Sequence, residues 1–111
     1  MPKRSTALYL GDILDSITKI EKFTKSVSLE KFLKDELTID AVVRNLEIIG
    51  EATRQMPERF KDKQPDIPWA KMISMRNKVI HEYSGVDAEI LWQTIQEDLP
   101  QLKKLIRKLH K

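Results

Sequence analysis

The longest apolar pattern in the chain repeats at helical spacing. Its members are separated by three, four, three, four and three positions, which places them along one side of a helix. They are Ile39, Val42, Leu46, Ile49, Thr53 and Met56. Pro57 follows at once, and proline ends a helix because it lacks an N–H donor and its ring clashes with the preceding turn. The pattern is too short for a free coiled coil, so we predict a helix that packs inside a bundle or across a dimer.

Helical spacing also dominates the flanking regions. A first helix is expected over residues 5–25, and Ser28 is a suitable N-cap for a short helix through Phe32 and Leu33. Residues 58–66 are expected to form a loop. The chain has only three glycines and no β-branched run that alternates with a period of two, so strands are not expected.

Two more helices are expected in the second half of the chain. One runs from Trp69 to Tyr83 and is closed by Gly85 in a left-handed conformation. The other is capped by Asp87 and continues toward the C-terminus, with a kink or a fresh start at Pro100. We therefore predict an all-α bundle of four main helices plus short helical pieces, formed by a single domain over residues 1–111.

The composition excludes several classes of protein and site. A length of 111 residues with 41% hydrophobic and 33% charged residues is typical of one small folded domain. Because the chain has no cysteine, disulfides, thiolate zinc sites and cysteine nucleophiles are excluded. No apolar run is long enough to cross a membrane, and no apolar signal-peptide core follows the N-terminus, so we expect a cytoplasmic protein.

The net charge of +3 permits an anionic partner without demanding one. The positive charge is concentrated in residues 103–111, which contain no acid. The cations there are Lys103, Lys104, Arg107, Lys108 and Lys111. They form either a solvated helix face that complements the negative end of the helix dipole or a patch that steers phosphates.

A charged residue interrupts the apolar stripe of the third long helix. Ile73, Arg76, Ile80 and Tyr83 are spaced by three, four and three, so the arginine projects where a core or an interface is expected. An unpaired buried charge costs several kcal/mol. Arg76 therefore either reaches solvent, pairs with Glu47 or Glu51 of the neighbouring helix, or serves a functional site.

Asn77 and His81 are four residues apart and are expected to share an edge of that helix next to Arg76. An imidazole can move protons near neutral pH and a guanidinium can stabilise phosphate charge, so the cluster suits a phosphodiester site. Arg76 and His81 would lie about 140° apart around the helix and about 7.5 Å apart along it. A two-fold dimer would bring two copies of the cluster together and supply both a base and an acid.

The string from Arg76 to Tyr83 reads R-N-x-x-x-H-x-Y and resembles the signature of the HepT-like toxins of the HEPN superfamily. The similarity extends to residues 41–52, 67–72 and 97–100, so it covers nearly the whole chain. The resemblance implies a HEPN-type helical bundle that forms homodimers, with the catalytic residues at a cleft in the dimer interface.

The same resemblance implies a metal-independent endoribonuclease that acts as the toxin of a type VII toxin–antitoxin pair. Arg76 and His81 match the catalytic pair, and Asn77 matches the polar residue that accompanies them. Tyr83 matches the tyrosine that an MntA-like nucleotidyltransferase antitoxin modifies with AMP taken from ATP. Arg76 and Lys78 are the expected phosphate contacts to RNA. The sequence shows no carboxylate–histidine pattern typical of a metal site, so neither a metal nor another cofactor is expected.

Two alternatives stay open at this stage. The chain could be a non-catalytic helical subunit that binds a nucleotide and docks a nucleotidyltransferase, with Arg76 and Lys78 as phosphate anchors. It could also be a structural oligomer without chemistry, although this would leave the polar cluster around Arg76 unexplained.

Overall fold

The structure is a computed structural model, and it describes residues 5–81 and 85–110. Its first half contains α1 (Thr6–Thr24), α2 (Leu29–Lys34), α3 (Glu36–Gln55) and α4 (Glu58–Asp62). Its second half contains α5 (Trp69–Val79), β1 (Ile80–His81), β2 (Gly85–Val86), α6 (Ala88–Gln93), the π-helical turn η1 (Thr94–Asp98) and α7 (Leu99–Leu109). The predicted all-α bundle of four main helical segments is confirmed, with one two-stranded ribbon added to it.

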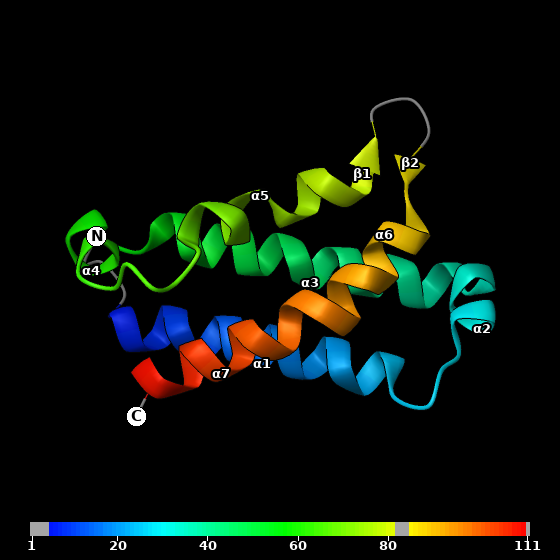
Figure 1. Ribbon diagram of the computed structural model, residues 1–111, viewed down its shortest axis with the longest axis horizontal. Coiled ribbons are helices and arrows are strands. Elements are labelled where there is room, and N and C mark those ends of the chain that lie inside the picture. The colour runs from blue at the N-terminus through cyan, green and yellow to red at the C-terminus, as the bar shows by residue number, and fades with distance from the viewer. Residues whose placement is uncertain (1–4, 82–84, 111) are drawn as a thin grey trace.

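The core forms around α3, which lies between α1 and α5 (Figure 1). Successive turns of each helix bring apolar side chains to the centre, where they lose contact with water. Those that are completely buried in α1 and α3 are Ile13, Ile17, Ile20, Val42, Leu46 and Ile49. The heptad-like pattern of the sequence therefore packs inside the bundle of a single chain.

The helix starts follow the capping residues of the sequence. The side chain of Ser28 accepts a hydrogen bond from the backbone N–H of Lys31, and that of Asp87 accepts one from Ile90. Near Pro100, where the sequence predicts a kink or a fresh start, the helix changes type but its backbone stays helical without a break. The five-residue π-helical turn η1 comes first, and α7 then begins at Leu99 with the proline in its first turn, where a missing N–H is tolerated.

Residues 58–66 are not a simple loop, so that prediction is wrong in part: α4 occupies most of them. Lys61 explains the order there. Its side chain is buried, and its Nζ donates to the backbone oxygen of Thr53 at 3.0 Å and lies 3.1 Å from Oε1 of Glu58. A cation at this place satisfies a carbonyl of the last turn of α3, where the helix dipole is negative.

The third long helix is shorter than the sequence predicts, because α5 ends at Val79 and not at Tyr83. The chain continues into β1, and Ile80 and His81 pair with Val86 and Gly85 of β2 in an antiparallel ribbon. Gly85 has a φ of 76°, as a left-handed position requires, but it begins a strand and does not cap a helix. Tyr83 lies outside the described residues.

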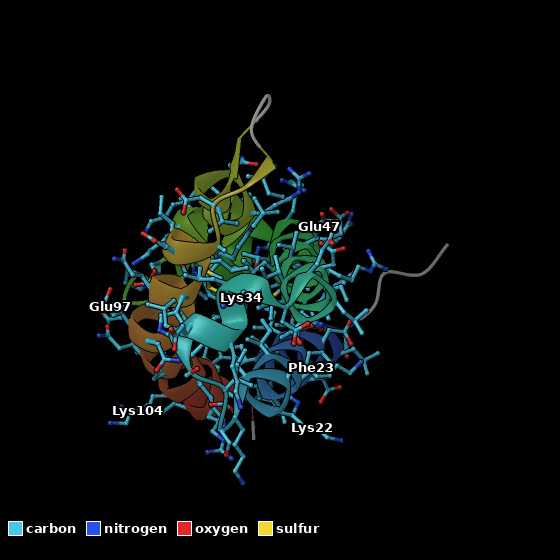
Figure 2. The ribbon with its side chains drawn as sticks, turned by 90° about the vertical axis from the view of Figure 1, so that its right-hand side faces the viewer. Lys22, Phe23, Lys34, Glu47, Glu97 and Lys104 are labelled. Atoms are coloured by element: carbon cyan, nitrogen blue, oxygen red, sulfur yellow. The ribbon has the colours of Figure 1, made fainter. Side chains whose placement is uncertain are left out.

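The ribbon projects from the bundle. Figure 1 shows β1 and β2 leaving the ends of α5 and α6, and the end-on view of Figure 2 shows them extending beyond the helices. The backbone N–H of Asp87 donates to the oxygen of Val79 at 2.6 Å and closes the base of the ribbon. β-branched residues such as Val79 and Ile80 lose side-chain freedom in a helix and favour strands, which fits the change of structure at this point.

Candidate active site

Arg76 lies on the exposed side of α5 that faces α3. Its Nε donates to Oε1 of Glu47 at 3.0 Å, and the two side chains are 45% and 39% exposed. Arg76 therefore does not project into the core of this chain, and of the environments that the sequence allows it has both an acidic partner and access to solvent. The buried stripe of α5 consists of Met72, Met75 and Val79, which have the same three-and-four spacing but lie on another side of the helix. The arginine has the expected partner, but the pair is not buried.

A hollow of about 330 Å³ lies in the surface between α3 and α5 beside this ion pair. Its lining residues are Leu46, Glu47, Gly50, Glu51, Arg54, Ile73, Arg76 and Asn77. A Cβ atom at Gly50 would lie 3.1 Å from the backbone oxygen of Ile73, so the two helices approach closely at these two lining residues. We call this feature the α3–α5 hollow.

Asn77 lines the α3–α5 hollow beside Arg76, as the sequence predicts for the polar companion of the arginine. The expected stacking of Asn77 and His81 on one helix edge is wrong, because α5 ends at Val79 and His81 belongs to β1. The 140° separation expected for Arg76 and His81 on one helix therefore does not apply. The structure describes the backbone of His81 but not its side chain.

Lys78 does not share the α3–α5 hollow with Arg76. Its Nζ lies 3.8 Å from Oδ2 of Asp98, and Nζ of Lys71 lies 3.3 Å from Oδ1 of the same carboxylate. Residues two apart on a helix are about 200° apart around its axis, so Arg76 and Lys78 point to opposite neighbours. The two expected phosphate contacts are thus separated by the body of α5.

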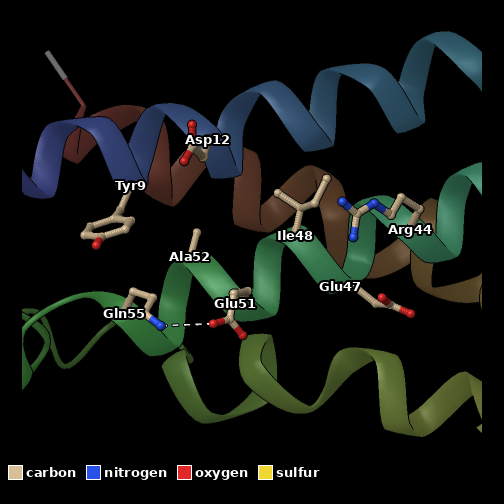
Figure 3. A pocket seen from close by; sticks show the side chains of 8 residues that line it. All are labelled: Tyr9, Asp12, Arg44, Glu47, Ile48, Glu51, Ala52 and Gln55. Atoms are coloured by element: carbon tan, nitrogen blue, oxygen red, sulfur yellow. Dashed lines mark hydrogen bonds between the residues drawn. The ribbon is translucent and has the colours of Figure 1, made fainter. Parts of the chain in front are cut away.

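A second hollow, of about 480 Å³, lies between α1 and α3. Figure 3 shows its lining residues, which are Tyr9, Asp12, Arg44, Glu47, Ile48, Glu51, Ala52 and Gln55. Tyr9 and Arg44 lie toward opposite ends of it (Figure 3). Sequence reasoning missed both residues, because each lies outside the apolar pattern of its helix and nothing local pairs them.

Glu47 and Glu51 line both hollows and form the ridge between them. Glu51 is bonded within its own helix, since Nε2 of Gln55 donates to its Oε1 at 3.0 Å and Nη1 of Arg54 to its Oε2 at 3.0 Å. The hydrogen bond from Gln55, aided by Arg54, holds the pKa of the Glu51 carboxyl below its ordinary value. Glu47 instead reaches across to α5.

The basic C-terminal segment is partly neutralised. Nζ of Lys103 lies 2.7 Å from Oε1 of Glu21 on α1, whereas Lys104, Arg107 and Lys108 are exposed. Lys111 lies outside the described residues. Within the described chain, no set of three His, Asp or Glu side chains is arranged to hold a metal ion. None of the described helices has the length and hydropathy needed to span a membrane.

Comparison with known proteins decides the family. The model of the family described as "Ribonuclease HepT-like" matches residues 13–109. The chain is a member of the HepT-like family. Its resemblance to these HEPN proteins, first apparent in residues 76–83, is thereby confirmed over most of its length.

Curated relatives of this HepT-like chain match it from end to end. "Probable ribonuclease HepT" of Thermococcus cleftensis is 50% identical over 109 residues, which cover 98% of this chain and 99% of that protein. "Putative RNase MJ1380" of Methanocaldococcus jannaschii is 41% identical over 104 residues, covering 94% and 95%. No solved structure matches the chain.

Proposed function

We propose that the protein is a metal-independent endoribonuclease in which Arg76 and His81 form the catalytic pair and Asn77 assists them. The observation that carries this proposal is the placement of Arg76. The arginine is half-exposed at the rim of an open hollow with Asn77 beside it, and the strand that carries His81 begins one residue after the end of its helix. Membership of the HepT-like family supports the same conclusion.

The proposed chemistry needs only side chains and the RNA itself. The 2′-hydroxyl loses its proton to a base and attacks the adjacent phosphorus, and the bond to the 5′-oxygen breaks as that oxygen takes up a proton from an acid. The products are a 2′,3′-cyclic phosphate and a 5′-hydroxyl. His81 moves the proton, because imidazole titrates near neutral pH, and Arg76 stabilises the charge on the phosphorane oxygens.

We further propose that the active form is a homodimer. One chain supplies one motif histidine, whereas the reaction uses a base and an acid. Two copies of the projecting ribbon, related by a two-fold axis, would place one His81 on each side of a bound phosphodiester.

The biological role that we propose is that of the toxin in a type VII toxin–antitoxin pair, acting in the cytoplasm. An MntA-like nucleotidyltransferase would join the phenolic oxygen of Tyr83 to the α-phosphorus of ATP, releasing pyrophosphate and a proton. The added AMP carries a phosphodiester anion, which would compete with RNA for Arg76. Intact-mass measurement after co-expression should show added AMP on the wild type and on Tyr9→Phe but none on Tyr83→Phe. AMP on the Tyr83→Phe chain would disprove this role.

The nuclease proposal is tested with purified protein and labelled RNA in the presence of a divalent-metal chelator. Arg76→Ala and His81→Ala should each reduce the cleavage rate by about 100-fold or more, as expected when a charge-stabilising or proton-transferring group is removed. His110→Ala and Arg59→Ala are matched controls, because both residues are exposed and far along the chain from the motif. Wild-type cleavage by the His81→Ala protein, or loss of wild-type cleavage on chelation, would overturn the proposal.

A further inference from the structure

Glu47 is the one acidic side chain of the described residues that pairs with Arg76. We propose that Glu47 is a positioning residue, which holds the guanidinium of Arg76 so that its terminal nitrogens face the RNA phosphate. This inference rests on the proposed nuclease function. It assigns a role to a residue outside the R-N-x-x-x-H-x-Y motif and on another helix.

The backbone fixes the distance between the two side chains. α3 and α5 run antiparallel (Figure 1), and Gly50 lies against the backbone of Ile73, whose oxygen would be 3.1 Å from a Cβ at this position. Glu47 lies about one turn before Gly50 on α3, and Arg76 lies about one turn after Ile73 on α5. Because the helices are antiparallel, one turn back along α3 and one turn forward along α5 lead in the same direction in space. Glu47 and Arg76 therefore lie opposite each other, about one turn from the Gly50 contact.

The pairing with Glu47 leaves the two terminal nitrogens of the Arg76 guanidinium available to bind a phosphate. Glu47 accepts from Nε, and no bond from Nη1 or Nη2 to a described residue accompanies it. A guanidinium binds phosphate best through two parallel N–H donors, and the two terminal nitrogens provide such a pair. A free arginine side chain has many rotamers, and a bond at Nε removes part of that freedom before the substrate arrives.

The negative charge of Glu47 has the opposite effect on binding. A carboxylate 3.0 Å from the guanidinium weakens its attraction for a phosphate, and Glu51 lies on the same ridge. Glu47 should therefore raise the rate of the bound complex while it lowers the affinity for RNA. The acceptor oxygen accounts for the first effect and the charge for the second, so the two can be separated by substitution.

Glutamine and alanine distinguish these effects in the full-length protein. Glu47→Gln keeps an oxygen that can accept from Nε but removes the charge, so kcat should stay within about threefold of wild type while KM falls by roughly threefold. Glu47→Ala removes the acceptor as well, and kcat should fall by about tenfold or more. Glu21 provides the matched control. It also pairs across helices, with Lys103, and is 43% exposed, so Glu21→Gln and Glu21→Ala should leave both constants unchanged.

The outcomes separate this inference from the function on which it rests. A Glu47→Ala protein with wild-type kcat, or a Glu47→Gln protein as slow as Glu47→Ala, would overturn the positioning role while Arg76→Ala still abolished cleavage. A wild-type protein that does not cleave RNA, or an Arg76→Ala protein as fast as wild type, would overturn the nuclease proposal itself. Thermal unfolding of each variant shows whether a loss of rate reflects loss of folded protein. A lower KM in Glu47→Gln could not arise from loss of folded protein, so it tests the proposal independently of stability.

Discussion

The two sides of α3 differ in what they contain and in how water reaches them. The buried side carries Val42, Leu46 and Ile49 into the core, and each of these side chains is inaccessible. The exposed side carries Glu47 and Glu51, which form the ridge between the two hollows. One helix thus specifies the fold with one set of positions and presents charged groups with another. Substitutions on the two sides should therefore affect different properties, namely the free energy of unfolding and the handling of RNA.

The largest expected effect on stability compares two adjacent isoleucines. Ile49→Ala should lower the free energy of unfolding by about 2–5 kcal/mol, because a buried isoleucine leaves a cavity when truncated. Ile48→Ala should lower it by about 1 kcal/mol or less, because Ile48 is only half-buried and lines the second hollow, between α1 and α3. Urea unfolding followed by circular dichroism measures both. Equal losses for the two variants would mean that the two sides of α3 do not differ as described.

Gly50 lies where the two sides meet, and its substitution has an unusual expected sign. Glycine to alanine inside a helix ordinarily stabilises by up to about 1 kcal/mol. At Gly50 the new Cβ would lie 3.1 Å from the backbone oxygen of Ile73, so Gly50→Ala should instead destabilise by about 1–3 kcal/mol.

Gly11 in α1 is the matched control for Gly50. Its nearest contact for a Cβ is a side-chain atom of His110 at an ordinary 3.5 Å, so Gly11→Ala should be neutral or stabilising. Melting temperatures compare the two variants directly. Stabilisation by Gly50→Ala would show that α3 and α5 can separate without loss, and would weaken the case for a fixed Glu47–Arg76 distance.

The smallest expected effect is at the start of α3, which serves both sides of the helix equally. The side chain of Asp35 accepts from the hydroxyl of Thr38 at 2.6 Å and from its backbone N–H at 3.0 Å. The hydroxyl bond and then the backbone bond lower the pKa of the Asp35 carboxyl below its ordinary 3.8. Its contribution to stability is therefore present above that ordinary value and disappears as the pH falls through the lower pKa of the folded state.

Asp35→Asn tests this dependence, because asparagine also caps helices but does not titrate. The variant should resemble the wild type at neutral pH and should lose less of its melting temperature on acidification below the ordinary aspartate pKa of 3.8. If the melting temperatures of the two proteins fell by the same amount over this pH range, the assigned pKa shift would be contradicted.

Much of the fold could be predicted, because apolar spacing and caps are local properties of the sequence. The long helix before Pro57 and the caps at Ser28 and Asp87 are present in the structure, and an irregularity does occur just before Pro100, as a π-helical turn. α4 was missed, because its order depends on the contact of Lys61 with Thr53, which has no periodic signature. The early end of α5 was missed for a similar reason, since apolar spacing continues past Val79 and only pairing with β2 interrupts it.

The site was predicted less completely than the fold. Arg76 and Asn77 of the motif both line the candidate site, and Glu47 is one of the two partners that the sequence offers for the arginine. The exposure of Arg76 could not be predicted, because α5 carries two overlapping apolar stripes and the sequence does not say which one is buried. The separation of Lys78 from Arg76 depends on Asp98, a residue distant in the chain. Side-chain contacts between distant segments thus account for most of what the sequence did not specify.

The buried amine of Lys61 has a consequence for protein engineering. The connection between α3 and α5, which contains α4, could be taken for a passive linker that any flexible segment of equal length could replace. Lys61 nevertheless holds the end of α3 through the Thr53 carbonyl, while the Lys61 carbonyl itself accepts from the indole nitrogen of Trp69 at 3.1 Å. Replacing this connection with a glycine–serine segment would remove the two Lys61 contacts that fix where α5 begins. Every later turn of α5 would then lose its fixed position against α3.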